Sequence, residues 1–176
     1  MSEPQVAIRP PHVAVIGESD PHGPDAQRLL DWAEEAGLLL ARSGATVVTG
    51  GLGGVMQAAS RGALLAGGMT IGILPGADAA EANPYVRQAI PTGLGVARNL
   101  VVVTASDAVL AIGGRHGTLS EIGLALRQGR EVVTLSSWRI DSDQRMGGPR
   151  VHRTRDPREA AALALRLAAA GPHQPG

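Results

Sequence analysis

The sequence contains no cysteine, no lysine and no phenylalanine. Without cysteine, disulfides, thiolate nucleophiles and cysteine-ligated zinc or iron–sulfur centres are excluded. Without lysine, every basic side chain is arginine or histidine, which excludes the lysine-dependent phosphate loop and an internal Schiff base to pyridoxal phosphate. Aromatic residues make up only 2% of the chain, so stacking against a flat ring falls to Trp32, Tyr85, Trp138 or arginine faces.

Charge is balanced, with 16 Lys+Arg against 16 Asp+Glu. Nucleic-acid-binding domains usually carry a basic excess. The only local excess, over residues 139–158, also contains Asp141, Asp143 and Asp156, so we interpret it as a solvated surface. No apolar run reaches the roughly 18–20 residues that span a bilayer, and the N-terminal segment lacks the apolar core of a signal peptide. We therefore expect a cytoplasmic protein without membrane contact.

Short strand-like runs alternate with longer helical runs, a pattern typical of a Rossmann-like three-layer α/β domain with a parallel sheet and crossover helices. We predict helices after the candidate N-caps Asp25 and Asp156. Residues 94–106 fit either a strand or a helix. We expect one domain over residues 12–170, with flexible tails at 1–11 and 171–176. The predicted strands are 12–17, 45–49, 69–74, 108–113 and 131–135, and the other predicted helices are 55–66 and 116–127.

Two glycine-rich turns each follow a strand and open a helix: T-G-G-L-G-G-V-M over 49–56 and G-G-R-H-G-T-L-S-E over 113–121. The carboxyl ends of parallel strands meet at one sheet edge, so both turns face the same crevice. Glycine lets an anion approach backbone N–H groups, and the helix dipole attracts its charge. Each turn alone is explained by tight strand-to-helix geometry, but two together favour an anion site, to which Thr118 adds a hydroxyl and Arg115 a cation.

These turns do not fit the dinucleotide fingerprint G-x-G-x-x-G, because Met56 stands where the third glycine belongs. Glu121 lies near the start of its helix, where it either complements the dipole or faces a ligand, binding a ribose hydroxyl or stabilising positive charge. His116 either meets a phosphate or begins the helix at the surface. The histidines show no metal-ligand spacing, so we expect no metal.

With T-G-L-G-V-A-R-N over 92–99, these motifs resemble the molybdenum-cofactor carrier-like branch of the Lonely Guy superfamily. That superfamily includes cytokinin-activating phosphoribohydrolases and proteins labelled possible lysine decarboxylases. The resemblance covers roughly residues 13–135. It implies a Rossmann-like sheet, a ligand at the strand ends, a homodimer or higher oligomer, and a helix within 94–106. The decarboxylase label does not suit a chain without lysine.

The resemblance also assigns roles to residues. Arg98 and Glu121 match the catalytic arginine and glutamate of the hydrolases, and Ser19 matches a serine of their first-strand loop. Gly117 and Thr118 match the phosphate-binding Gly-Thr pair. The chain departs from the hydrolase pattern at Gly95, Val96, Asn99, Gly113 and Arg115, and the carrier-like branch shares its Ala-Arg-Asn form.

We therefore predict a binding or carrier protein for a phosphorylated small ligand, with a nucleotide or the molybdenum cofactor as cargo and no cofactor required. The alternative is a nucleoside 5′-monophosphate phosphoribohydrolase that releases free base and ribose 5-phosphate through Glu121 and Arg98. A DNA-processing family has a related fold, but the balanced charge argues against nucleic acid. The predicted ligand-binding residues are Gly17, Ser19, Gly50, Gly51, Gly53, Gly54, Met56, Arg98, Asn99, Gly113, Gly114, Arg115, His116, Gly117, Thr118 and Glu121.

Overall fold

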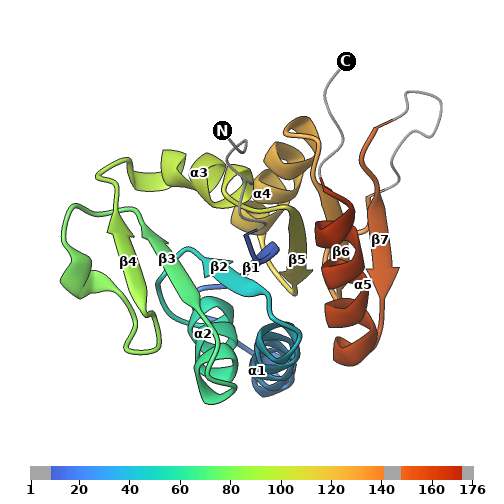
Figure 1. The fold of residues 1–176 in the computed structure, drawn as a ribbon, viewed down its shortest axis with the longest axis horizontal. Coiled ribbons are helices and arrows are strands. Elements are labelled where there is room, and N and C mark those ends of the chain that lie inside the picture. Colours follow the sequence, from blue (N-terminus) through green and yellow to red (C-terminus); the bar gives the residue numbers. More distant parts are fainter. Residues whose placement is uncertain (1–8, 141–147, 172–176) are drawn as a thin grey trace, which may run out of the picture.

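The computed structural model describes residues 9–140 and 148–171. In these residues a single seven-stranded sheet runs in the order β4-β3-β2-β1-β5-β6-β7, and all neighbouring strands are parallel (Figure 1). The Rossmann-like α/β fold predicted from the alternating pattern is confirmed. The strands are β1 His12–Gly17, β2 Thr46–Thr49, β3 Thr70–Leu74, β4 Gln88–Pro91, β5 Ala108–Ile112, β6 Glu131–Leu135 and β7 Val151–Thr154.

Five α-helices and two short 3-10 helices connect the strands in the described part of the chain. None of the described helices is long and apolar enough to cross a membrane. The predicted tails lie largely outside the described residues, as do residues 141–147 of the arginine-rich segment. The helices are α1 Ala26–Arg42, α2 Val55–Leu65, α3 Arg98–Thr104, α4 His116–Arg127 and α5 Pro157–Ala170, with η1 Ala79–Glu81 and η2 Gly95–Ala97.

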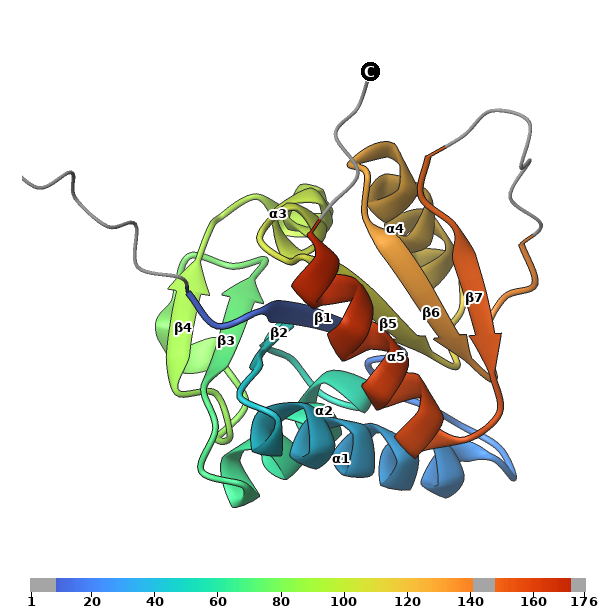
Figure 2. The same cartoon turned by 45° about the vertical axis from the view of Figure 1, so that its right-hand side comes forward.

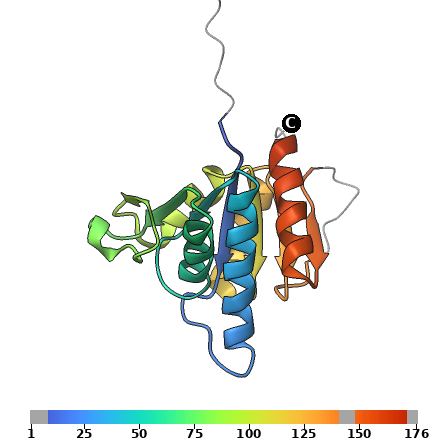
Figure 3. The ribbon, with the colours of Figure 1, turned by 60° about the horizontal axis from the view of Figure 1, so that its bottom comes forward.

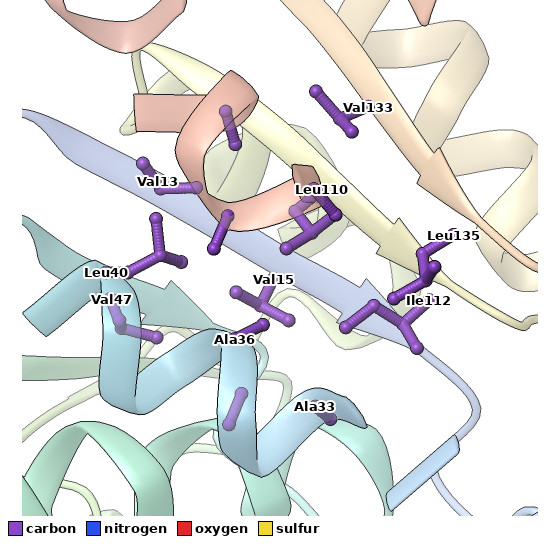
Figure 4. Packing of buried hydrophobic residues seen from close by; sticks show 14 of the residues in the cluster. Val13, Val15, Ala33, Ala36, Leu40, Val47, Leu110, Ile112, Val133 and Leu135 are labelled. Atoms are coloured by element: carbon purple, nitrogen blue, oxygen red, sulfur yellow. The ribbon is translucent and has the colours of Figure 1, made fainter. Parts of the chain in front are cut away.

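The sheet separates two apolar layers, because successive strand residues point to opposite faces. From β1, Val13 and Val15 pack with α1, α2 and α5, whereas Ala14 and Ile16 pack with α3 and α4. Figure 3 shows α1, α2 and α5 beside one another, and Figure 4 shows side chains of their layer meeting those of the sheet. The central strands are covered by helices on both faces of the sheet. Their sequences are therefore nearly continuous apolar runs.

The order of the strands creates a crevice at the centre of the sheet. From β1 the chain moves outward through β2 and β3 to β4, and then returns to place β5 on the other side of β1. In β1, Val13 is paired with Val47 of β2 on one side and with Ala108 of β5 on the other. Connections that leave in opposite directions from neighbouring strands open a crevice at their carboxyl ends, where α/β proteins commonly bind ligands.

The two outermost strands, β4 and β7, were not predicted. Their sequences, Q-A-I-P and V-H-R-T, are short and partly polar, because an edge strand is paired on one side only and is less buried. Periodicity therefore gives little signal for them. The ambiguous segment 94–106 forms η2 followed by α3, as the resemblance implied.

The two predicted N-caps behave differently. Asp156 accepts hydrogen bonds from the backbone N–H groups of Arg158 and Glu159, at 2.9 and 3.0 Å, so its capping role is confirmed. Asp25 occupies the N-cap position of α1, but its side chain makes no capping hydrogen bond. Its backbone is helical (φ −94°, ψ −5°), not extended as a side-chain cap usually requires. Its carboxylate pairs instead with Arg28 at 2.9 Å.

Candidate functional site

A cavity of about 640 Å³ lies at the carboxyl edge of the sheet, in the central crevice. Loops after β1, β2 and β3 line it, together with η2 and the first turns of α3 and α4. The structure thus brings together the two glycine-rich turns and the 92–99 motif, which are far apart in sequence. The predicted residues that line the cavity are Gly17, Ser19, Gly50, Met56, Arg98, Asn99, Arg115, Gly117, Thr118 and Glu121.

Several predicted glycines do not line the cavity but allow its walls to pack. Gly54 adopts a φ of +61°, and a Cβ there would lie 2.2 Å from the backbone oxygen of Glu18. A Cβ on Gly53 would lie 3.0 Å from the backbone oxygen of Ser19. The first glycine-rich turn therefore supports the loop after β1, and this loop reaches the cavity. The predicted residues outside the lining are Gly51, Gly53, Gly54, Gly113, Gly114 and His116.

His116 lies on the outer side of the second turn. Its ring is tilted against that of Trp138, with centroids 5.7 Å apart. The indole N–H of Trp138 donates to the backbone oxygen of Arg115 at 3.0 Å. Of the two interpretations that the sequence left open for His116, the structure favours a surface residue at the start of the helix. The contact with Trp138 holds the turn from outside.

Arg98 and Glu121 face each other inside the cavity wall. Each residue is 8% exposed, and Arg98 Nη1 lies 3.9 Å from Glu121 Oε1. Arg98 Nη1 also donates a hydrogen bond to Asn99 Oδ1. The Nε atom of Arg98 is buried without a hydrogen-bond partner among the described residues. A buried donor without a partner destabilises the folded protein.

Burial shifts both ionisation equilibria of this pair. Desolvation raises the pKa of Glu121 from 4.5 to about 7, although the neighbouring Arg98 charge opposes the rise. Desolvation likewise lowers the pKa of Arg98, and Glu121 opposes that change. Arginine nevertheless stays charged in proteins. Below pH 7 the wall therefore carries a cation beside a mostly neutral carboxylic acid, a combination that favours an anionic ligand.

The remaining polar wall comes from α4 and from the loop after β1. Thr118 is 3% exposed and stands in the first turn of α4, where the backbone N–H groups have no helical partner. Glu18 lies 3.5 Å from Arg115, and Asp20 lies 3.2 Å from His22. Hydroxyl, amide and guanidinium donors thus face one space with acceptors on its rim. This arrangement can bind an anionic group and orient a polar one.

Sequence reasoning missed several lining residues. Glu18, Asp20 and His22 belong to the loop after β1, from which only Gly17 and Ser19 were predicted. Their signal is positional, since a loop at the carboxyl end of a central strand in this topology reaches the crevice. Ile16, Leu52, Pro75, Gly95 and Val96 complete the lining and carry no chemical signature.

Comparisons with known proteins agree with this geometry. The molybdenum cofactor binding protein from the phototrophic bacterium Rippkaea orientalis is 35% identical, with a TM-score of 0.79, and the match covers 92% of this chain and 99% of that one. The molybdenum cofactor carrier protein from Chlamydomonas reinhardtii is 33% identical, with a TM-score of 0.75 and the same coverage of 92% and 99%. A protein from Archaeoglobus fulgidus is 42% identical over 103 residues, which are 58% of this chain and 68% of that one.

These relatives confirm the resemblance to the carrier-like branch of the superfamily. The sequence profile of the SLOG cluster4 family matches residues 10–161, which is most of the chain. The protein therefore belongs to the SLOG cluster4 family.

Proposed function

We propose that this protein binds the molybdenum cofactor as cargo, holding it by its phosphate in the central cavity. The proposal is supported by solved relatives described as molybdenum cofactor binding and carrier proteins, at 33–35% identity over nearly their whole length. It is also supported by a cavity that combines a buried arginine with hydroxyl and amide donors. The pterin part of the cofactor carries one phosphate, which such donors recognise.

The donors divide into two groups. Gly117 and Thr118 present backbone N–H groups at the start of α4, where the helix dipole favours a phosphate, and Thr118 adds its hydroxyl. Arg98 supplies a buried positive charge from α3. The loop after β1, with Ser19 and Glu18, also lines the cavity and offers polar groups to a ring system. At about 640 Å³ the cavity has the volume of a small-molecule site.

The observation that carries the proposal is the buried guanidinium of Arg98 in the wall of this cavity, beside Gly117 and Thr118 at the start of α4. This guanidinium is 8% exposed and keeps a positive charge in the wall, with Glu121 3.9 Å away and Asn99 accepting a hydrogen bond from it. A phosphate oxygen suits this charge, because charge-assisted hydrogen bonds to arginine are among the stronger polar contacts.

Mass spectrometry of the small molecule released from the purified protein tests this proposal. We expect a phosphorylated pterin in the wild-type protein and a reduced amount in Arg98→Ala. Arg166→Ala, an exposed change on α5 away from the cavity, should retain the wild-type amount. A mononucleotide in place of the pterin would contradict the cargo, and a preparation with no phosphorylated molecule would contradict the binding role.

One observation favours a second function, hydrolysis of a nucleoside 5′-monophosphate. Glu121 and Arg98 correspond to the catalytic pair of the related hydrolases, and here they lie 3.9 Å apart in the cavity. Incubation with a panel of nucleoside 5′-monophosphates should then release free base, and Glu121→Ala should abolish release while leaving binding largely intact. We favour the carrier because Val96, Asn99 and Arg115, which depart from the hydrolase pattern, all line the cavity.

We also propose that the protein forms a homo-oligomer through the surface beside η2 and α3. Four apolar side chains are exposed there, with Val96 at 82%. Monomers rarely expose such clustered apolar surface, and a second copy of the chain would cover it. Val96 also lines the cavity, so an interface at this surface would shape the cavity rim. The exposed side chains are Leu94, Val96, Leu100 and Val101.

A further inference from the structure

A second cavity, of about 310 Å³, lies at the carboxyl ends of β6 and β7. These two strands pair along their length and end near the beginnings of α5 and α1 (Figure 2). It shares no lining residue with the central cavity. The residues that line it are Trp32, Thr134, Ser136, Ser137, Arg139, Arg153, Thr154 and Arg155.

The charged side chains that line this second cavity are all positive. Three arginines line it and no aspartate or glutamate does, whereas Glu18, Asp20 and Glu121 line the central cavity. Over residues 9–140 and 148–171, Arg139, Arg153 and Arg155 make no ion pair with a carboxylate. Like charges around one space repel each other, and a bound anion relieves that repulsion.

The remaining wall supplies hydroxyl groups. The Oγ atom of Ser137 is buried and has no hydrogen-bond partner in the described part of the chain. Ser136, next to it, has a φ of +51°, and no other non-glycine residue within the described ranges has a positive φ. The hydroxyls of Thr134 and Thr154 are already bonded to backbone oxygens of the two strands. Ser137 therefore offers an unused donor beside three cations.

We propose that this second cavity binds the phosphate group of a small phosphorylated ligand, independently of the central cavity. Arginine suits a tetrahedral oxyanion because its planar guanidinium donates two parallel hydrogen bonds. Arg153 and Arg155 approach from the end of β7, Arg139 approaches from the segment after β6, and Ser137 adds its hydroxyl. A phosphate fills only part of the volume, and Trp32 adds an aromatic side chain to the lining for the rest of the ligand.

Isothermal titration with inorganic phosphate at fixed ionic strength tests the proposal. The titration is done in Arg98→Ala combined with Thr118→Val, which removes the buried cation and the hydroxyl donor of the central cavity and changes no residue that lines the second one. We expect saturable binding in this background and a loss of at least tenfold in affinity when Arg153→Ala and Arg155→Ala are added. Arg166→Ala, an exposed arginine change outside both cavities, should not alter the affinity.

Three results would overturn the proposal: no saturable phosphate binding, unchanged affinity without Arg153 and Arg155, or an equal loss in Arg166→Ala. The arginines are exposed, so their replacement should leave the fold intact, and circular dichroism checks this. If the double change unfolds the protein, Arg153→Gln and Arg155→Gln are made singly, and each should weaken binding at least threefold. Because the central cavity is tested by Thr118 and Arg98, failure at one site does not imply failure at the other.

Discussion

Burial of Glu121 predicts that the stability of this protein falls as the pH rises through 7. Its pKa is raised from 4.5 to about 7 in the folded protein, because desolvation outweighs the attraction of Arg98. Between these two values the folded state holds a proton that the unfolded state has released. Stability decreases with pH wherever the folded state binds more protons. The contribution of Glu121 is therefore fully present below pH 4.5 and is lost as the pH rises through 7.

The size of the effect follows from the shift. Each tenfold difference in proton affinity corresponds to about 1.4 kcal/mol, so a rise from 4.5 to about 7 amounts to about 3 kcal/mol in total. Most of that, about 2 to 3 kcal/mol, is lost between pH 5 and pH 8. This is a large share of the roughly 5–15 kcal/mol by which domains are stable. Urea unfolding at pH 5, 6, 7 and 8 measures it directly.

Glu121→Gln isolates this contribution, because glutamine has the shape of the protonated acid and does not titrate. Between pH 5 and 8 the free energy of unfolding should fall in both proteins, but by about 2 to 3 kcal/mol less in the variant than in the wild type. Glu81→Gln, which changes an exposed carboxylate on η1, should follow the wild-type curve. Parallel pH curves for the wild type and Glu121→Gln would refute the assignment of a raised pKa to this residue.

Three further predictions concern the ligand, the turn and the assembly. Thr118→Val should weaken ligand binding by about 0.5–2 kcal/mol in calorimetry. Thr104→Val, on the exposed surface of α3, should leave the affinity unchanged. Equal affinity in the two variants would exclude the Thr118 hydroxyl as a donor to the ligand. Gly54→Ala should lower the free energy of unfolding in urea by at least about 2 kcal/mol. The new Cβ would lie 2.2 Å from the backbone oxygen of Glu18, and this clash adds to the strain of a positive φ. Gly67→Ala, with φ +75° and no nearby atom, should cost only about 1–2 kcal/mol. Leu100→Asp should shift light-scattering mass toward the monomer, and Leu65→Asp, at another exposed site, should not.

The central fold was predictable because its strands are buried on both faces. β1 and β5 consist almost entirely of apolar residues, and buried parallel strands read as such runs. The crossover helices α1 and α4 show apolar residues at helical spacing, and glycines mark their ends. Where burial weakens, at the edge strands β4 and β7, the pattern weakens with it, and both strands were missed.

The site was predictable at the level of loops but not of individual side chains. Parallel topology alone places the two glycine-rich turns at one edge, and the cavity lies there. What a given glycine does is not visible in sequence, since close approach to a ligand and close approach to another loop both require the absence of Cβ. Gly53 and Gly54 serve the second purpose, against Ser19 and Glu18. The acidic residues Glu18 and Asp20 of the loop after β1 were missed because no local sequence pattern marks them as part of a site.

The chemistry of Glu121 bears on the choice between carrier and hydrolase. A carboxylate that stabilises positive charge on a sugar ring must be ionised when the reaction occurs. Here burial keeps the group about half protonated near pH 7, and Arg98, at 3.9 Å, already neutralises part of the ionised form. A phosphate bound beside the pair would add negative charge and raise the pKa of Glu121 further. Ligand binding thus favours the protonated acid, which donates a hydrogen bond to an oxygen of the ligand and does not repel it. That behaviour suits retention of an anionic cargo better than cleavage of a glycosidic bond.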